Sequence, residues 1–133
     1  MRFNFRNHRD EIILAVNVIG RGVDKDWLKA MIYYNQDGFT ANYRIEFLRH
    51  ELFTFSEGLK KLNRELSGEA TFSNIEAEIV INLSTDGLGH IMTKGLLRRS
   101  FPSEVETSFF IQSDQTFLPL LISESDKILE YYG

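Results

Sequence analysis

The chain has 133 residues, a formal net charge of −4 at neutral pH and no cysteine. This length suits one domain with a sizeable core, and we expect a single domain over residues 1–133. The absence of cysteine excludes disulfides, thiolate metal sites and cysteine nucleophiles. The mildly acidic balance disfavours general binding to nucleic acid, because that binding depends on Lys and Arg at the phosphates.

The N-terminal segment lacks the apolar stretch of a signal peptide. The longest apolar run, Ile12–Val18, includes Asn17 and is too short to span a bilayer. We therefore expect a soluble, cytoplasmic protein.

Eight segments have the composition or the alternating pattern of β-strands. In chain order they are a short edge strand Phe3–Phe5, then Glu11–Val18, Trp27–Tyr34, Phe39–Phe47, Glu69–Phe72, Glu76–Leu83, His90–Leu97 and Val105–Ser113. Apolar residues alternate with polar ones most clearly in Phe39–Phe47, and such alternation indicates an antiparallel sheet that is covered on one face. Asp37-Gly38 supplies the positive φ that a tight hairpin needs.

Two segments have a helical period instead. His50–Leu66 carries an apolar stripe with spacings of three and four, and Ser67-Gly68 is expected to end this helix. The second predicted helix is Phe117–Tyr131. Thr116 is its expected N-cap, which places Pro119 in the first turn, where a missing N–H has no cost.

The order of these elements predicts an α+β fold with two layers. Short connections favour an antiparallel meander, so we expect one sheet of about six or seven strands. The apolar stripes of both helices and the apolar face of the sheet indicate that the helices pack together on that face.

The stretch Ser84–Ile91, STDGLGHI, has the residues of a site but the context of a turn. A phosphate loop joins a strand to a helix, whereas this stretch joins two extended segments. It has one carboxylate and one histidine, which are too few ligands for calcium or zinc. We therefore predict a hairpin turn at Asp86-Gly87.

No motif for catalysis is present. The chain lacks a Gly-x-Ser-x-Gly elbow, and the spacing of His8, His50 and His90 does not bring them together. Paired carboxylates on a sheet face can act as acid and base, but charged residues there more commonly keep an open face soluble. We expect no catalytic residue, no cofactor and no metal ion.

The open sheet face is the best candidate for a partner-binding surface. It is expected to combine charged side chains with larger apolar ones such as Val80, Met92 and Phe110, and an interface typically has apolar anchors within a polar rim. The predicted partner-binding residues are Arg44, Glu46, Glu78, Lys94 and Glu106.

A family resemblance rests on five stretches and covers most of the chain, from about Asp26 onward. They are GFTANY at Gly38–Tyr43, the helix Glu51–Leu66, LSGEATF at Leu66–Phe72, DGLGHI at Asp86–Ile91 and DQTFLP at Asp114–Pro119. This combination resembles the WapI-type immunity proteins and related small bacterial proteins.

The resemblance implies a non-enzymatic cytoplasmic protein that neutralises a cognate toxin domain by binding it. Such toxin domains are often nucleases and hence often basic, which an acidic partner would suit. Two alternatives stay open. One is a small enzyme or ligand-binding domain with a cleft between helices and sheet, with Asp86 and His90 at its mouth. The other is a homo-oligomeric structural domain.

Overall fold

The computed structural model describes all 133 residues and contains eight strands, a short 3₁₀ helix and two α-helices. Their bounds in chain order are β1 Arg2–Arg6, β2 Ile12–Arg21, β3 Trp27–Gln36, β4 Phe39–Leu48, α1 Arg49–Glu65, β5 Glu69–Ser73, β6 Ile79–Thr85, β7 His90–Arg99, β8 Val105–Asp114, η1 Gln115–Phe117 and α2 Leu118–Tyr131. All eight predicted strands and both predicted helices are confirmed.

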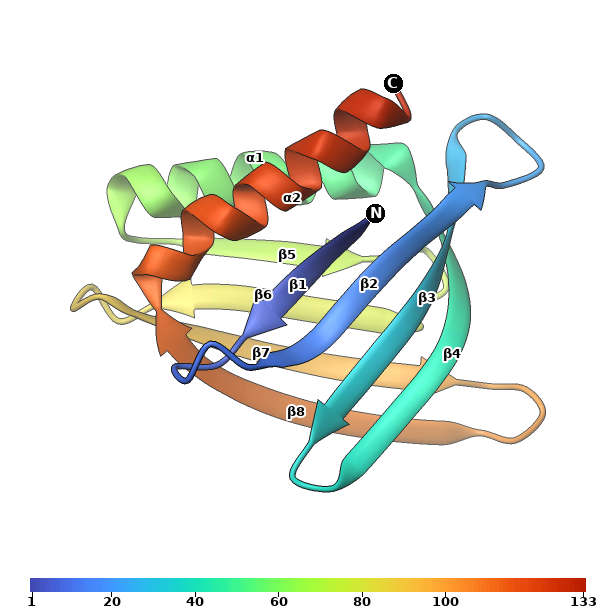
Figure 1. Ribbon diagram of the computed structural model, residues 1–133, viewed down its shortest axis with the longest axis horizontal. Helices are drawn as coiled ribbons and strands as arrows, with labels where there is room; N and C mark the ends of the chain where they lie inside the picture. Colours follow the sequence, from blue (N-terminus) through green and yellow to red (C-terminus); the bar gives the residue numbers. More distant parts are fainter.

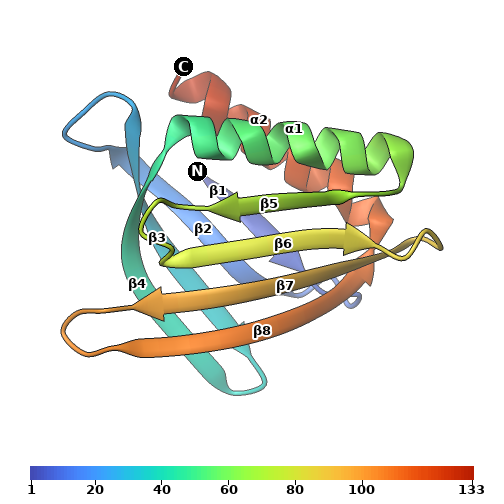
Figure 2. The ribbon, with the colours of Figure 1, turned by 180° about the vertical axis from the view of Figure 1, so that it is seen from behind.

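The strands form two antiparallel sheets of four, β1-β2-β3-β4 and β5-β6-β7-β8. The first sheet crosses in front of the second in Figure 1, and Figure 2 shows the same two layers from behind. The prediction of an α+β meander is confirmed, but the prediction of one sheet of six or seven strands is wrong. Helix α1 lies between β4 and β5 in the chain, and these two strands do not pair.

The core lies between the two sheets and beneath the helices. Thirty buried apolar residues from both sheets and both helices form one cluster. Tyr34 of β3 contacts Phe109 of β8, with ring centroids 5.2 Å apart. The Phe72 ring of β5 meets Phe3 and Phe47 of the first sheet edge-on, at 5.4 and 5.3 Å. Each sheet thus covers the apolar face of the other.

The helices close one side of this sandwich. Helix α1 packs along β5, α2 packs along β1, and the two helices contact each other (Figure 2). Ser56 of α1 donates a hydrogen bond of 2.6 Å to the Asp126 carboxylate of α2. Neither helix has the length and apolar content that a membrane-spanning segment needs.

Local chemistry sets where the helices begin and end. The Leu48 N–H donates to the Glu51 carboxylate at 2.7 Å where α1 begins, and Leu66 takes a left-handed conformation, with φ of 52°, where α1 ends. Before α2, the Asp114 carboxylate accepts from the Thr116 N–H at 2.9 Å. Asp114 is therefore the cap of the 3₁₀ turn, and the prediction of Thr116 as N-cap was wrong. Pro119 lies in the first turn of α2, as predicted.

Two turns set where neighbouring strands end and begin. Asp37 and Gly38 have φ of 52° and 86°, which confirms the predicted hairpin between β3 and β4. The predicted strand at Glu76 begins later, at Ile79, because Ala77 has a φ of 54° and belongs to the turn after β5. Glu78 consequently lies in this turn rather than within a strand.

Candidate partner-binding site

The predicted partner-binding residues do not share one sheet face. Arg44 and Glu46 lie on the outer face of the first sheet, and Lys94 and Glu106 lie on the outer face of the second. These two faces point away from each other because the sheets pack through their inner faces. Glu78 belongs to neither face, since it lies in the turn between β5 and β6.

Asn74 nevertheless links Glu46 to Glu78. Its side chain is 4% exposed and donates to the Glu46 carbonyl at 3.1 Å and to the Glu78 carboxylate at 3.0 Å. The Asn74 side-chain oxygen accepts from the N–H groups of Glu78 and Ile79, at 2.8 and 3.3 Å. These hydrogen bonds join the first sheet to the turn that precedes β6.

Arg98 bonds to the turn that carries Glu78 and lies opposite Glu106 in the second sheet. The Arg98 N–H donates to the Glu78 carbonyl at 2.9 Å, and the Arg98 guanidinium donates to the Glu76 carbonyl at 2.9 Å. Glu106 lies directly opposite Arg98 in the pairing of β7 with β8. Glu46 and Glu78 therefore belong to one hydrogen-bond network, and Glu106 lies at its margin, opposite Arg98.

Burial and neighbouring charge both act on Glu78. Burial raises the pKa of the Glu78 carboxyl above its ordinary value, and the charges of Glu76 and Glu46 add to this effect. The hydrogen bond from Asn74 and the charge of Arg98 work in the opposite direction. Burial also raises the pKa of Tyr43, whose hydroxyl donates to the Glu78 carbonyl at 2.7 Å.

Three connections lie on the side of the molecule that carries this network, and together we call them the loop end. They are residues 22–26 between β2 and β3, residues 74–78 between β5 and β6, and residues 100–104 between β7 and β8. Figures 1 and 2 both show all three at the same end of the molecule. Each exposes one large apolar side chain: Val23 is 103% exposed, Ile75 66% and Phe101 85%.

The loop end is also rich in carboxylates. Its acidic residues are Asp24, Asp26, Glu76, Glu78 and Glu104. Lys25 is the one basic residue within the three connections. An exposed surface with apolar side chains among mostly acidic ones has the composition of a protein-binding surface more than that of an inert one.

The stretch STDGLGHI is a turn, as predicted, and joins β6 to β7 at the opposite end of the molecule (Figure 2). The Asp86 carboxylate accepts from the Leu88 N–H at 2.7 Å and lies 2.6 Å from the His90 ring nitrogen. The hydrogen bond from Leu88 and then the contact with His90 lower the pKa of Asp86. No three histidine or acidic side chains converge here or elsewhere to hold a metal ion.

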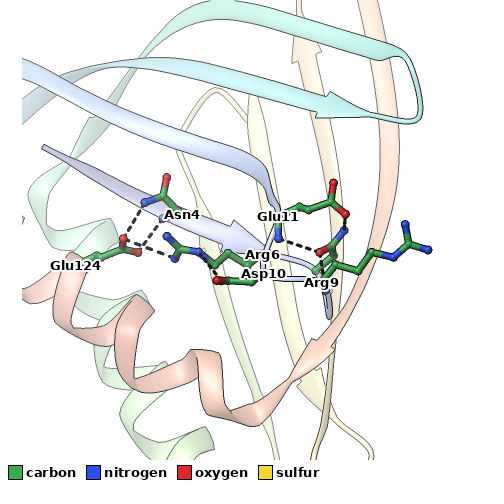
Figure 3. A network of polar contacts seen from close by, with 7 residues as sticks. Asn4, Arg6, Arg9, Asp10, Glu11 and Glu124 are labelled. Atoms are coloured by element: carbon green, nitrogen blue, oxygen red, sulfur yellow. Dashed lines mark hydrogen bonds and ion pairs between the residues drawn. The ribbon is translucent and has the colours of Figure 1, made fainter.

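A second polar network fixes α2 against β1 (Figure 3). The Glu124 carboxylate accepts from the Asn4 backbone N–H at 3.1 Å and from its side-chain amide at 2.7 Å. Arg6 lies 3.9 Å from Glu124 and 3.2 Å from Asp10. Beside this network, a cavity between β1, α2 and the second sheet has a volume of only about 20 Å³. This cavity is too small to hold a small-molecule ligand.

The sequence did not reveal Asn74 or Arg98 as parts of the candidate site. The available sign was Asn74 itself, which follows the predicted strand Glu69–Phe72 in a short polar connection. An Asn in such a place commonly closes a turn with its own side chain.

Comparison with known proteins gives one informative match. A search of curated proteins found none that matches the chain. The family model described as the immunity protein WapI-like family matches residues 4–133, which is nearly the whole chain. Together with the α+β fold, this match shows that the chain belongs to the WapI-like immunity protein family.

Proposed function

We propose that this protein neutralises a cognate bacterial toxin domain by binding it directly at the loop end. Membership of the family indicates a role in toxin immunity, and immunity proteins of this family are in general not enzymes. The observation that carries the proposal is the network in which Asn74 joins Glu46 to Glu78 and Arg98 bonds to the same turn, with Glu106 opposite Arg98 and three exposed apolar side chains at this end of the molecule.

The chemistry of this surface favours a basic toxin domain, such as a nuclease. Carboxylates in excess attract a basic partner and speed its association. The exposed side chains of Val23, Ile75 and Phe101 can be buried in the complex, and such apolar anchors supply much of the affinity of an interface. Arg44 and Lys94 remain proposed contacts outside the loop end, in the middle of β4 and β7 and on opposite outer faces.

The first experiment identifies the toxin domain by capture from the native host. The tagged protein is used as bait, and the recovered protein is then produced and tested for growth arrest in a cell that lacks the immunity protein. We expect recovery of a domain from a large secreted or surface protein, and we expect co-expression of this chain to restore growth. A captured domain that arrests growth equally with and without co-expression would contradict the proposal.

Charge reversal then tests the loop end. The variant Glu46→Lys, Glu78→Lys, Glu106→Lys is expected to weaken binding by at least about 100-fold, since opposed charges at an interface cost several kcal/mol. The matched control reverses Glu57, Glu65 and Glu130 on the helices, which changes the net charge equally. Thermal unfolding confirms that both variants fold. If both variants lose the same affinity, the effect is one of net charge and the interface lies elsewhere.

A further inference from the structure

The two sheets have four edge strands, and three of these edges are occupied within the protein. The edge of β1 faces α2, where the Asn4 N–H donates to Glu124. The edge of β5 faces α1, so closely that a Cβ on Gly58 would lie 3.2 Å from the Ala70 Cβ. Exposed strand edges invite pairing with other chains, and covering them is how folded proteins prevent it.

The edge of β8 is occupied by two hydrogen bonds from the first sheet and its turns. The Gln36 side chain donates to the Phe110 carbonyl at 3.0 Å. The His8 backbone N–H donates to the Gln112 carbonyl at 3.1 Å. The last edge, that of β4, has such bonds only near the end of the strand, where the Glu46 carbonyl accepts from Asn74 and the Leu48 N–H donates to Glu51.

The direction of the β4 backbone follows from its neighbours. The Glu46 carbonyl points away from β3, because it accepts from Asn74. The Trp27 carbonyl of β3 accepts from the Gly22 N–H on the far side, so Trp27 does not bond to β4. Alternate residues of a strand direct their N–H and C=O groups to the same side, and β3 pairs with β4 without a bulge. The residues with backbone groups on the open edge are therefore Thr40, Asn42 and Arg44.

These backbone groups have no partner in the protein. Strand β4 pairs only with β3, and no hydrogen bond reaches the N–H or C=O groups of Thr40, Asn42 or Arg44. From Thr40 to Arg44 the first sheet thus ends in an unpaired ladder, which is the template that an added strand requires.

A cleft of about 200 Å³ lies beside this edge. Residues 40–43 of β4 form one wall, and the other is formed by Leu97, Arg99, Val105 and Thr107. In the alternation of β7 and β8, these four residues are on the inner face of the second sheet, together with buried Phe109 and Ile111. Val105 is 47% exposed whereas Ile111 is 1% exposed. At this corner the first sheet is too narrow to cover the second.

Arg99 adds a charge to the cleft. Its Nε is buried without a hydrogen-bond partner, and no carboxylate pairs with its guanidinium. The Ser103 hydroxyl, at 3.5 Å, is the one side-chain group that it reaches. An unpaired guanidinium beside an open strand edge suits an incoming carboxylate.

We propose that the open edge of β4 binds an extended segment of the toxin domain as a fifth strand of the first sheet. This inference rests on the proposed function and names how the partner is held. The added strand takes its backbone hydrogen bonds from Thr40, Asn42 and Arg44. Its inward apolar side chains cover Leu97 and Val105, and an acidic side chain pairs with Arg99. An extended segment fits this cleft of about 200 Å³, and an acidic side chain on it would match the charge of Arg99, which has no carboxylate partner within the protein.

A proline substitution tests the edge without disturbing the fold. Asn42→Pro removes one outward N–H, and proline is tolerated on an edge strand where that N–H bonds to no neighbour. The control Asn42→Ala keeps the N–H and removes only the side chain. The probe is an inactivated form of the toxin domain that the capture experiment identifies, and affinities are measured by titration calorimetry.

We expect Asn42→Pro to fold and to bind at least about tenfold more weakly, because a strand hydrogen bond is lost and the proline ring blocks the approach. Asn42→Ala is expected to stay within about threefold of the original protein. Equal affinity of folded Asn42→Pro and the original protein would overturn the strand addition while leaving the immunity function intact. If the original protein fails to bind the toxin domain, both proposals fall.

Amide hydrogen exchange provides a second test, which does not depend on substitution. In the free protein the N–H groups of Asn42 and Arg44 are expected to exchange quickly, whereas those of Ala41 and Tyr43, directed toward β3, exchange slowly. Binding of the toxin domain is expected to protect Asn42 and Arg44. Protection already present in the free protein and rising with its concentration would instead show pairing with a second copy and would overturn the proposal.

Discussion

At the scale of single residues, Asn74 and its neighbours hold the candidate surface together. Asn74 is buried and makes four hydrogen bonds, two as donor and two as acceptor, to the first sheet and to its own turn. A buried polar group that loses its partners costs more free energy than a surface group, because water cannot replace them.

Replacement of Asn74 by alanine is expected to lower the free energy of unfolding by about 2–3 kcal/mol, because it leaves several buried N–H and C=O groups unpaired. The control is Asn82→Ala. Asn82 donates to Glu69 and Thr71 on an exposed sheet face, so water can take its place and the change is expected to be below about 1 kcal/mol. Urea unfolding measures both. Similar losses in the two variants would contradict the role given to Asn74.

Glu78 gives a prediction about pH. Burial raises the pKa of Glu78 in the folded state above 4.5, so the folded protein holds this proton more tightly than the unfolded chain does. Stability conferred by this group is therefore present at low pH and is lost as the pH rises through the raised pKa. Glu78→Gln removes the titration and keeps an acceptor for Asn74.

We expect Glu78→Gln to be more stable than the original protein at pH 7, and the difference to shrink at pH 4. The free energy of unfolding of both proteins is measured at pH 4 and at pH 7. The difference between the two proteins at one pH serves as the control for the difference at the other. A difference that stays constant between pH 4 and pH 7 would show that the charge of Glu78 is not the cause.

At the scale of elements, the packing of the two sheets depends on the pair of Gly95 with Phe109. These residues lie directly opposite each other in β7 and β8, and the Phe109 ring covers Gly95. The same ring contacts Tyr34 of the other sheet, so it has little room to move. A side chain at Gly95 would overlap this ring.

Gly95→Ala is accordingly expected to lower the free energy of unfolding by about 1–3 kcal/mol, the usual cost of overpacking a core. Gly20→Ala in β2 is the matched control, because no atom lies within 4 Å of the position that its Cβ would take. Its effect is expected to stay within about 0.5 kcal/mol. Thermal unfolding of the two variants tests the contrast, and equal stability of the two would contradict it.

At the scale of the whole molecule, the sequence predicts elements better than their arrangement. The alternation of apolar and polar residues in Phe39–Phe47 indicates that one face of the strand is covered. It does not indicate which element covers that face. A helix layer and a second sheet leave the same alternation, so the split into two sheets was not predictable from pattern alone. The Asp37-Gly38 hairpin was predictable because its chemistry is local.

The candidate site was likewise predictable only in its residues and not in their arrangement. Glu46 and Glu78 are predicted as charged surface residues, but their connection runs through Asn74, which has no marked pattern in the sequence. The open edge of β4 was also not predictable, because it depends on which strands lack a neighbour. The network around Asn74 and the open edge of β4 both depend on how segments far apart in the chain are arranged.

The central claim is that this chain inhibits a toxin domain by forming a stoichiometric complex with it. The most direct measurement is the activity of the purified cognate toxin domain against increasing amounts of this protein. We expect activity to fall linearly and to end at one molecule of this protein per toxin domain, without any added cofactor. Full activity at a several-fold excess of this protein, or complete inhibition at far below one equivalent, would contradict a binding mechanism.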